Sequence, residues 1–280
     1  MFGLNNPNVS TLLKFIHVSD LHLVPKGDRL WGLDPFARLE ACLDDIMKLH
    51  GDAAFVVISG DLTENGDVLA YRQLKARLAD FPIETHVMLG NHDDRAHFLS
   101  VFTQGPKDDN GFVQSAITRD GARFLFLDTL KGPPSSAGLY CASRKAWLKA
   151  ELAAGGKHPL YLFMHHPPFA IAHDLMDLIM LDDAEDFLAL LNGHSVRHIF
   201  FGHAHRPISG QFRGISFSAP PSLVHQLPLV SDSVATIYSN EPAMYAVVHA
   251  AADKIVVHMD AFLNRHAADM DPQAERGTWF

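Results

Sequence analysis

The stretch KFIHVSDLH, from Lys14 to His22, combines an apolar run with polar side chains that follow it at once. The apolar and β-branched residues between Phe15 and Val18 are typical of a buried strand. Asp20 and His22 come directly after this run, with one residue between them. Because alternate residues of an extended segment point to the same side, this stretch predicts a strand that brings a carboxylate and an imidazole to one place.

Four later apolar runs end in the same way. The polar residues that follow FVVISG, HVMLG, LYLFM and HIFFG are, in turn, Asp61; Asn91, His92 and Asp93; His165 and His166; and His203 and His205. If the strands are parallel, their carboxyl ends meet at one edge of a sheet, where α/β proteins bind ligands. Carboxylate and imidazole groups are good ligands for divalent transition metals. The sequence therefore predicts a metal site at this edge.

Strand-like runs alternate with helix-like segments along most of the chain. The expected strands are Leu13–Ser19, Phe55–Ser59, Thr85–Leu89, Arg123–Leu127, Leu160–Met164 and His198–Phe201. The expected helices are Phe36–Leu49, Val68–Asp80, Arg144–Ala153 and Asp182–Leu191. This alternation indicates βαβ units and a largely parallel sheet. The later runs Ile215–Ser218, Met244–His249 and Lys254–His258 look like antiparallel strands, which we expect to complete a second sheet.

Composition narrows the class of protein. The 280 residues fit one large domain, and the two cysteines, Cys42 and Cys141, are too few for a disulfide framework, which favours a cytoplasmic protein. No apolar run approaches the roughly 20 residues of a membrane-spanning helix, so no membrane partner is expected. The formal charge of −9 argues against nucleic-acid polymers as partners. A phosphate substrate remains compatible with this charge, because bound divalent metals reverse the local field.

The motifs DLH, GDLTENG, GNHDD, HHPP and GHAH, in this order, resemble those of the calcineurin-like metallophosphoesterase superfamily. The resemblance extends from about Phe15 to about Gln226 and is greatest to class III cyclic nucleotide phosphodiesterases and bacterial glycerophosphodiesterases. We therefore expect an α/β fold, a four-layer αββα sandwich in which two mixed β-sheets are flanked by helices. Residues 1–263 would form the catalytic domain and residues 264–280 a C-terminal tail.

The resemblance also implies two divalent metal ions in one site. The ligands of one ion would be Asp20, His22, Asp61 and His205. The ligands of the other would be Asp61, Asn91, His165 and His203, so that Asp61 bridges both ions. His165 is preferred to His166 because the ligand in this family directly follows the strand. The metals themselves stay open, because Mn, Fe, Zn and Co all accept such ligands.

The activity implied by the resemblance is hydrolysis of small phosphodiesters, either 3′,5′-cyclic nucleotides or glycerophosphodiesters, by a metal-bound hydroxide. Two cations can clamp a phosphoryl group and lower the pKa of a bound water to about 7. His92, next to a ligand, is expected to stabilise the phosphate or protonate the leaving group. Asp93 is a candidate for orienting a histidine.

Alternatives to this activity and to single residues stay open. A phosphomonoesterase, a nuclease or a nucleotide-sugar pyrophosphatase of the same superfamily would use the same ligands, although a nuclease should also have a basic groove. A non-catalytic metal-binding scaffold usually lacks some of the ligands, and this chain has all seven. The resemblance further suggests a homo-oligomer.

Some polar residues near the motifs have two interpretations. Asn91 and His92 could cap a helix that begins near Asp94 rather than serve the site. His225 could line the cleft or be structural. The segment around Met176 could be a substrate-side lid or the start of a packed helix. Asp128 ends a strand, and we expect it to bond backbone rather than metal.

Overall fold

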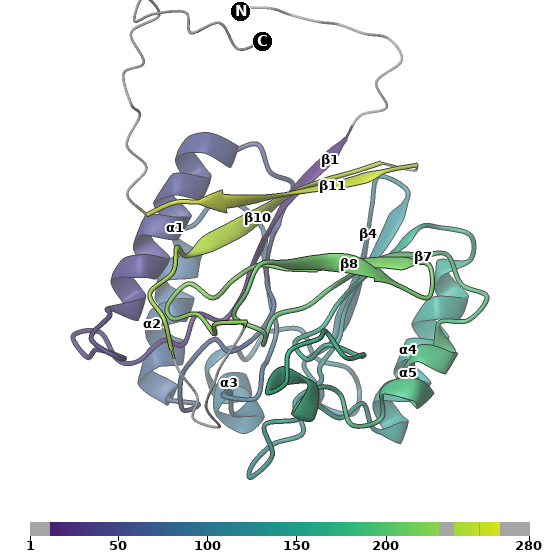
Figure 1. Cartoon of the computed structure of the whole chain (residues 1–280), viewed down its shortest axis with the longest axis horizontal. Helices are drawn as coiled ribbons and strands as arrows, with labels where there is room; N and C mark the ends of the chain where they lie inside the picture. The colour runs from purple at the N-terminus through teal and green to yellow at the C-terminus, as the bar shows by residue number, and fades with distance from the viewer. Residues whose placement is uncertain (1–11, 230–237, 252, 264–280) are drawn as a thin grey trace, which may run out of the picture.

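The computed structural model describes residues 12–229, 238–251 and 253–263, and its strands form two separate sheets (Figure 1). The tail expected at residues 264–280 lies outside the described residues, so the domain boundary at residue 263 stays a prediction. No helix within the described ranges is long and apolar enough to cross a membrane.

The first sheet has the strand order β11-β10-β1-β2-β3. Its strands are β1 (Leu13–Val18), β2 (Val56–Ile58), β3 (Thr85–Val87), β10 (Met244–Ala250) and β11 (Ile255–Ala261). β1, β2 and β3 are parallel, whereas β10 is antiparallel to both β1 and β11. The carboxyl ends of the three parallel strands therefore lie at one edge.

The second sheet has the order β4-β5-β6-β7-β9-β8. Its strands are β4 (Ser115–Arg119), β5 (Ala122–Phe126), β6 (Leu160–Phe163), β7 (Val196–Phe200), β8 (Ile208–Phe212) and β9 (Ile215–Ala219). β5, β6, β7 and β9 run parallel, and β4 and β8 are antiparallel strands at the two sides.

The expectation that the late strands complete one second sheet is wrong. β9 joins the second sheet in parallel with β7, whereas β10 and β11 extend the first sheet beside β1. The physical reason is that β1 would otherwise present an unpaired backbone edge, and β10 satisfies it through five residue pairs from Leu13 to His17. Strand pairing of this kind depends on long-range contacts that the local pattern does not contain.

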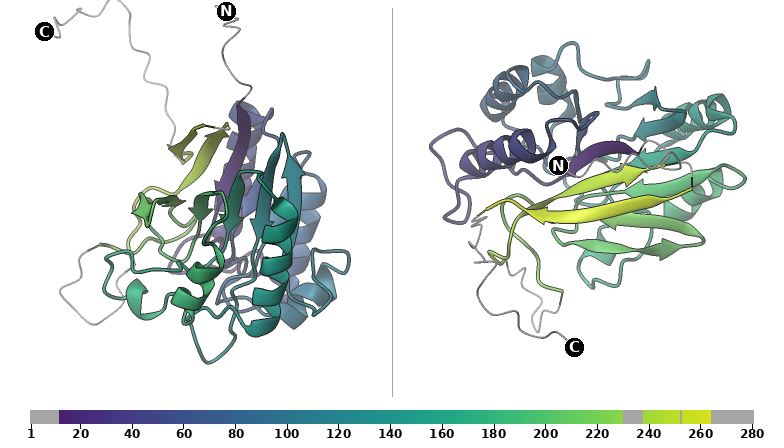
Figure 2. Two further views of the ribbon diagram at one scale, coloured as in Figure 1. Left: turned by 90° about the vertical axis from the view of Figure 1, so that its right-hand side faces the viewer. Right: turned by 90° about the horizontal axis from the view of Figure 1, so that it is seen from above.

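Helices cover the outer faces of both sheets. They are α1 (Pro35–His50), α2 (Val68–Ala79), α3 (Arg95–Val101), α4 (Ala142–Gly155) and α5 (Ala184–Leu190), together with the one-turn 3₁₀ helix η1 (Met176–Leu178). α1 to α3 lie on the side of the first sheet, and α4 and α5 lie together on the side of the second (Figures 1 and 2). The molecule is therefore a four-layer αββα sandwich with two mixed sheets inside, which confirms the predicted fold class.

Alternation within β1 explains how the layers pack. Ile16 and Val18 belong to the core between the first sheet and its helices, whereas Phe15 belongs to the core between the two sheets. The ring of Phe15 stacks on Phe55 at 4.9 Å and meets the edge of Phe200, from the second sheet, at 5.6 Å. The two sheets are thus joined by aromatic packing, which fixes the edges that carry the polar loops.

Candidate metal centre

The loops after β1, β2, β3, β6 and β7 bring all seven predicted metal ligands into one connected region. Five of these residues have positive φ, between 44° and 65°: Asp20, His22, Asp61, His203 and His205. Such backbone costs of order 1–3 kcal/mol per residue and is concentrated at functional sites. Backbone bonds between loops hold it in place, since Asp20 N–H donates to the Gly60 carbonyl at 3.1 Å and His22 N–H to the Asp61 carbonyl at 2.9 Å.

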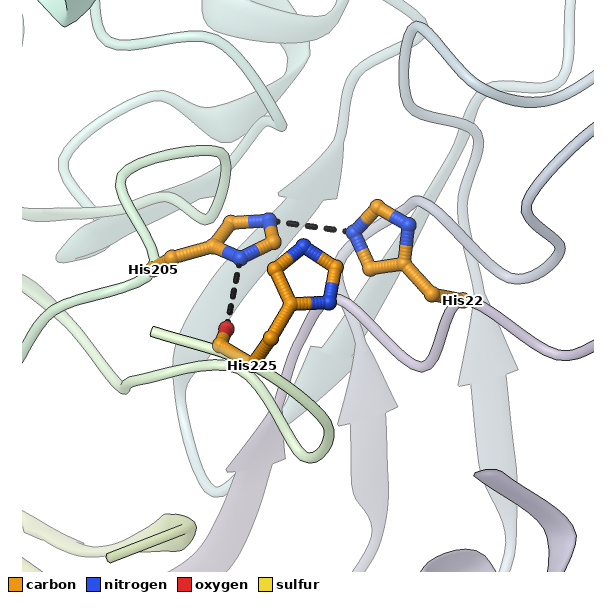
Figure 3. Close-up of side chains that lie close together, drawn as sticks. All are labelled: His22, His205 and His225. Atoms are coloured by element: carbon orange, nitrogen blue, oxygen red, sulfur yellow. Dashed lines mark hydrogen bonds between the residues drawn. The ribbon is translucent and has the colours of Figure 1, made fainter. Parts of the chain in front are cut away.

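The first cluster contains the four residues that the family resemblance assigned to one ion. The ligand atoms of Asp20, His22, Asp61 and His205 all lie within 4.8 Å of one another, and all four side chains are buried. The Nε2 atoms of His22 and His205 are 3.0 Å apart (Figure 3). The Nε2 atom of His205 also lies 3.3 Å from Asp20 Oδ1. The four donors therefore converge on one point.

The partners of the other ring nitrogens fix the histidine tautomers in this cluster. Nδ1 of His22 lies 2.6 Å from a carboxylate oxygen of Glu64, and Nδ1 of His205 lies 2.8 Å from the carbonyl oxygen of His225. Both partners are acceptors, so both Nδ1 atoms carry the proton and both Nε2 atoms present lone pairs to each other. Two facing lone pairs beside two carboxylates would be stabilised by a cation between them, and this donor set suits a divalent transition metal.

A second group forms around His165. Its Nε2 atom lies 3.2 Å from Asn91 Oδ1 and 3.3 Å from Asp61 Oδ2, and its Nδ1 atom donates to the Ser59 carbonyl at 2.9 Å. His166 instead has Nδ1 at 2.7 Å from the Thr129 hydroxyl. These contacts place His165, rather than His166, beside Asp61 and Asn91, the other residues that the resemblance implies for the second ion.

His203 completes the second group from β7. It forms a potential metal-binding cluster with His165 and His166, with ligand atoms within 4.8 Å of one another. Nε2 of His203 lies 3.2 Å from the carbonyl oxygen of Ile179, beside η1. Donation to this carbonyl places the proton on Nε2 and leaves Nδ1 as the ligand atom.

The electrostatics of the cluster also favour a cation. Although burial lowers the pKa of His165, the charge of Asp61 and its hydrogen bond raise it to about 9. A proton is therefore held where the carboxylate of Asp61 meets an imidazole. A divalent ion in the same position would replace that proton, because metal ligands must be deprotonated.

His92 lies at the opening of the site rather than among the ligands. Its Nδ1 atom donates to the Glu64 carbonyl at 2.9 Å, and its backbone N–H donates to Asp61 Oδ1 at 2.9 Å. Burial lowers the pKa of His92, but the nearby charges of Asp61 and Glu64 leave it raised overall. The cap of α3 is Asp94, which accepts from His97 N–H, so His92 and Asn91 are not needed as caps.

Asp93 does not contact a histidine as its sequence position suggested. It accepts hydrogen bonds from the backbone of Leu62, Thr63 and Gly90 and from the Tyr71 hydroxyl at 2.7 Å. It therefore ties the loops after β2 and β3 together and positions Asp61 and Asn91 indirectly. Asp128 bonds Arg95 and backbone N–H groups, as expected.

Glycine is required where the loops approach one another most closely. A Cβ atom on Gly90 would lie 2.2 Å from Asp61 Oδ1, and one on Gly202 would lie 2.0 Å from Ser19 Oγ. Any side chain at Gly90 would therefore displace the carboxylate that joins the two groups. These contacts explain why glycine precedes the polar residues of the GNHDD and GHAH motifs.

Three further side chains contact the site or one another beside it and were not assigned to it from the sequence. Glu64 bonds His22, His225 lies 4.6 Å from the ring of His205, and Tyr238 lies 4.3 Å from the ring of His225. Two of them carried a signal in the sequence: Glu64 lies in the GDLTENG motif, and His225 lies in the stretch that resembles the family. A cavity of about 280 Å³ joins the groups, and η1 lines it through Met176, in agreement with the substrate-side interpretation of that segment.

Comparison with known proteins identifies the class. The chain belongs to the calcineurin-like phosphoesterase family, whose model matches residues 13–207. It is 40% identical to a probable cyclic nucleotide phosphodiesterase of Rhodopseudomonas palustris over 90% of this chain and 93% of that protein. It is 30% identical to glycerophosphodiester phosphodiesterase GpdQ of Enterobacter lignolyticus over 81% and 83%. Among solved structures, purple acid phosphatase from yellow lupin seeds has the same fold, with a TM-score of 0.65 at 13% identity over 93% of this chain and 53% of that one.

Proposed function

We propose that this protein is a metal-dependent phosphoric diester hydrolase that binds two divalent ions and cleaves small phosphodiesters, either 3′,5′-cyclic nucleotides or glycerophosphodiesters. The observation that carries the proposal is the position of Asp61, which contacts His22 at 3.6 Å and His165 at 3.3 Å through one carboxylate oxygen. Asp20, His22, Asp61 and His205 would hold one ion. Asp61, Asn91, His165 and His203 would hold the other.

The bound ions would lower the pKa of a coordinated water and stabilise negative charge on the phosphoryl group. The chain itself supplies orientation and a proton. Each of the four ligand imidazoles is oriented by a hydrogen bond from its other ring nitrogen. The acceptors are the Glu64 carboxylate and the carbonyl oxygens of His225, Ser59 and Ile179. His92, with Nδ1 donating to the Glu64 carbonyl, keeps Nε2 free to hold a proton for the leaving oxygen.

The charge of the cavity supports a diester over a monoester or a polymer. Its lining, as far as the structure describes it, includes no lysine or arginine. The adjoining groove of about 720 Å³ contains Arg95, whose guanidinium is bonded to Asp128. A diester carries one negative charge and a monoester up to two, so a lining that adds no lysine or arginine to the two proposed ions favours the diester. A nuclease would need the basic groove that these linings do not provide.

The cellular location and the oligomeric state of the protein are part of the same proposal. Both cysteines are free, which supports a cytoplasmic enzyme. The homo-oligomer suggested by the family resemblance stays a prediction.

The test is to compare hydrolysis of bis(p-nitrophenyl) phosphate with that of p-nitrophenyl phosphate, with added Mn²⁺ and with a chelator. We expect fast cleavage of the diester, slow cleavage of the monoester, and loss of both on chelation. Preference for the monoester would make the protein a phosphatase. No cleavage of either ester by protein that contains metal would favour the non-catalytic scaffold.

A further inference from the structure

An aromatic row leads from the metal centre to the surface. The ring of His225 lies 4.3 Å from that of Tyr238, and Tyr238 lies 5.0 Å from that of Trp31. Exposure rises along the row, from 3% for His225 to 38% for Tyr238 and 62% for Trp31. The inner end lines the same cavity as His22 and His205. The row is therefore continuous with the site.

The backbone at Trp31 is unusual for a tryptophan. Leu30 and Leu33 exchange two backbone hydrogen bonds of 2.9 Å around Trp31 and Gly32, whose φ values are 53° and 79°. Two consecutive positive φ values are the pattern of a type I′ turn, which favours Asn-Gly or Gly-Gly. A tryptophan here strains the backbone and exposes a large apolar ring. Residues that break local rules in this way are expected at functional positions.

The position of the aromatic row indicates which part of a substrate it would contact. A phosphoryl group held between His22 and His165 directs its ester groups into the cavity that Tyr238 lines. The partly exposed rings of Tyr238 and Trp31, whose centroids are 5.0 Å apart, then lie one beyond the other on the path of a planar group attached to that phosphate. We do not expect Arg29 to bind this planar group, because its guanidinium donates to the Gly32 carbonyl at 3.1 Å and supports the turn.

We propose that Trp31 and Tyr238 form an aromatic subsite that stacks on a planar aromatic group of the diester, with the nucleobase of a nucleotide as the class that fits. This inference rests on the proposed function. Stacking on aromatic side chains tolerates all bases, because every base has a π face. The subsite therefore favours nucleoside esters over glycerol esters and discriminates little between adenine and guanine.

A matched set of variants distinguishes the contribution of the Trp31 ring to substrate binding from that of the turn conformation. Trp31→Asn keeps the positive φ and removes the ring, Trp31→Phe keeps a ring, and Leu69→Asn removes an apolar side chain of 49% exposure from α2. The readout is the ratio of kcat/KM for adenosine 3′,5′-cyclic monophosphate to that for glycerophosphoethanolamine. We expect Trp31→Asn to lower this ratio roughly 5- to 150-fold through KM, the range that corresponds to loss of one stacking contact. Trp31→Phe should keep most of the ratio, and Leu69→Asn should not change it.

Folding and binding are measured separately from turnover. Because asparagine suits the turn, the melting temperature of Trp31→Asn should equal or exceed that of the unchanged protein. Adenosine 5′-monophosphate should quench tryptophan fluorescence, and Trp31→Phe should abolish most of that quenching.

An unchanged ratio in a folded Trp31→Asn variant would overturn the subsite. Quenching that persists in Trp31→Phe would overturn it as well. If Trp31→Asn changes only the oligomeric state in size-exclusion chromatography, the row is an interface between copies and the subsite is wrong. Absence of cleavage of any diester by the unchanged protein would instead refute the proposed function, and the quenching experiment would still decide whether the subsite exists.

Discussion

His22 and His205 meet with their Nε2 atoms 3.0 Å apart although they follow strands of different sheets, β1 of the first and β7 of the second. Neither sheet alone contains a complete set of ligands. The aromatic core between the sheets, in which Phe15 contacts Phe200, therefore also determines the geometry of the metal centre.

Replacement of Asp61 should affect both ions. Asp61→Ala removes the only carboxylate placed in both proposed ligand sets, so both occupancies should fall. Turnover should decrease by more than the roughly 10- to 100-fold typical of residues that merely support a ligand. Metal content by mass spectrometry and diester hydrolysis measure the two effects. Asp44→Ala, at a side chain with 76% exposure, is the control. One ion kept at full occupancy with nearly normal turnover would show that Asp61 does not bridge.

His92 should act on turnover without affecting metal binding. His92→Ala removes the proposed proton donor while all seven ligands stay in place, so kcat should fall about 10²- to 10⁴-fold at unchanged metal content. His97→Ala, an exposed histidine on α3, is the matched control and should keep normal kcat. Equal kcat for both variants would remove His92 from the mechanism.

The ion pair between Arg95 and the buried Asp128 should contribute more to the free energy of unfolding than an exposed ion pair does. Asp128 is fully buried and accepts two bonds from Arg95, at 2.7 and 2.9 Å. Asp128→Ala leaves this cation unpaired and should lower the free energy of unfolding by about 3–5 kcal/mol. Glu185→Ala breaks the exposed pair with Arg213 and should cost less than about 1 kcal/mol. Urea unfolding measures both, and equal effects would contradict the contrast.

Acid should destabilise the protein partly through His198. This histidine is buried between the Ser216 and Ser218 hydroxyls, and burial lowers its pKa to about 3. In the unfolded chain the His198 imidazole binds a proton once the pH falls below its ordinary pKa of 6.5. In the folded chain it does not bind one until the pH approaches 3. Stability is therefore lost as the pH falls through this window, by about 2 kcal/mol at pH 5.

The variant His198→Asn isolates this effect, because asparagine can bond the serines without titrating. Urea unfolding at pH 7 and pH 5 should show a smaller loss of stability in the variant than in the unchanged protein. Equal losses in both would show that His198 does not contribute to acid sensitivity.

Local patterns in the sequence predicted the alternation of strands and helices, and polar residues directly after apolar runs marked the carboxyl ends of strands. The four layers and the seven candidate ligands were implied by the family resemblance. The partition of β9, β10 and β11 between two sheets did not follow, because it depends on which strand edges remain unpaired. Glu64 and Tyr238 were also missed. Glu64 lies in the GDLTENG motif, but its contact to His22, like the contact of Tyr238 to His225, depends on the tertiary structure.

The most direct test of the dinuclear centre is to titrate Mn²⁺ into metal-free protein while both bound ions and diester turnover are measured. We predict that turnover reaches its maximum only as occupancy approaches two ions per chain and is lost again on chelation. Full turnover with one ion per chain, or with none, would contradict the two-ion site that Asp61 is proposed to bridge.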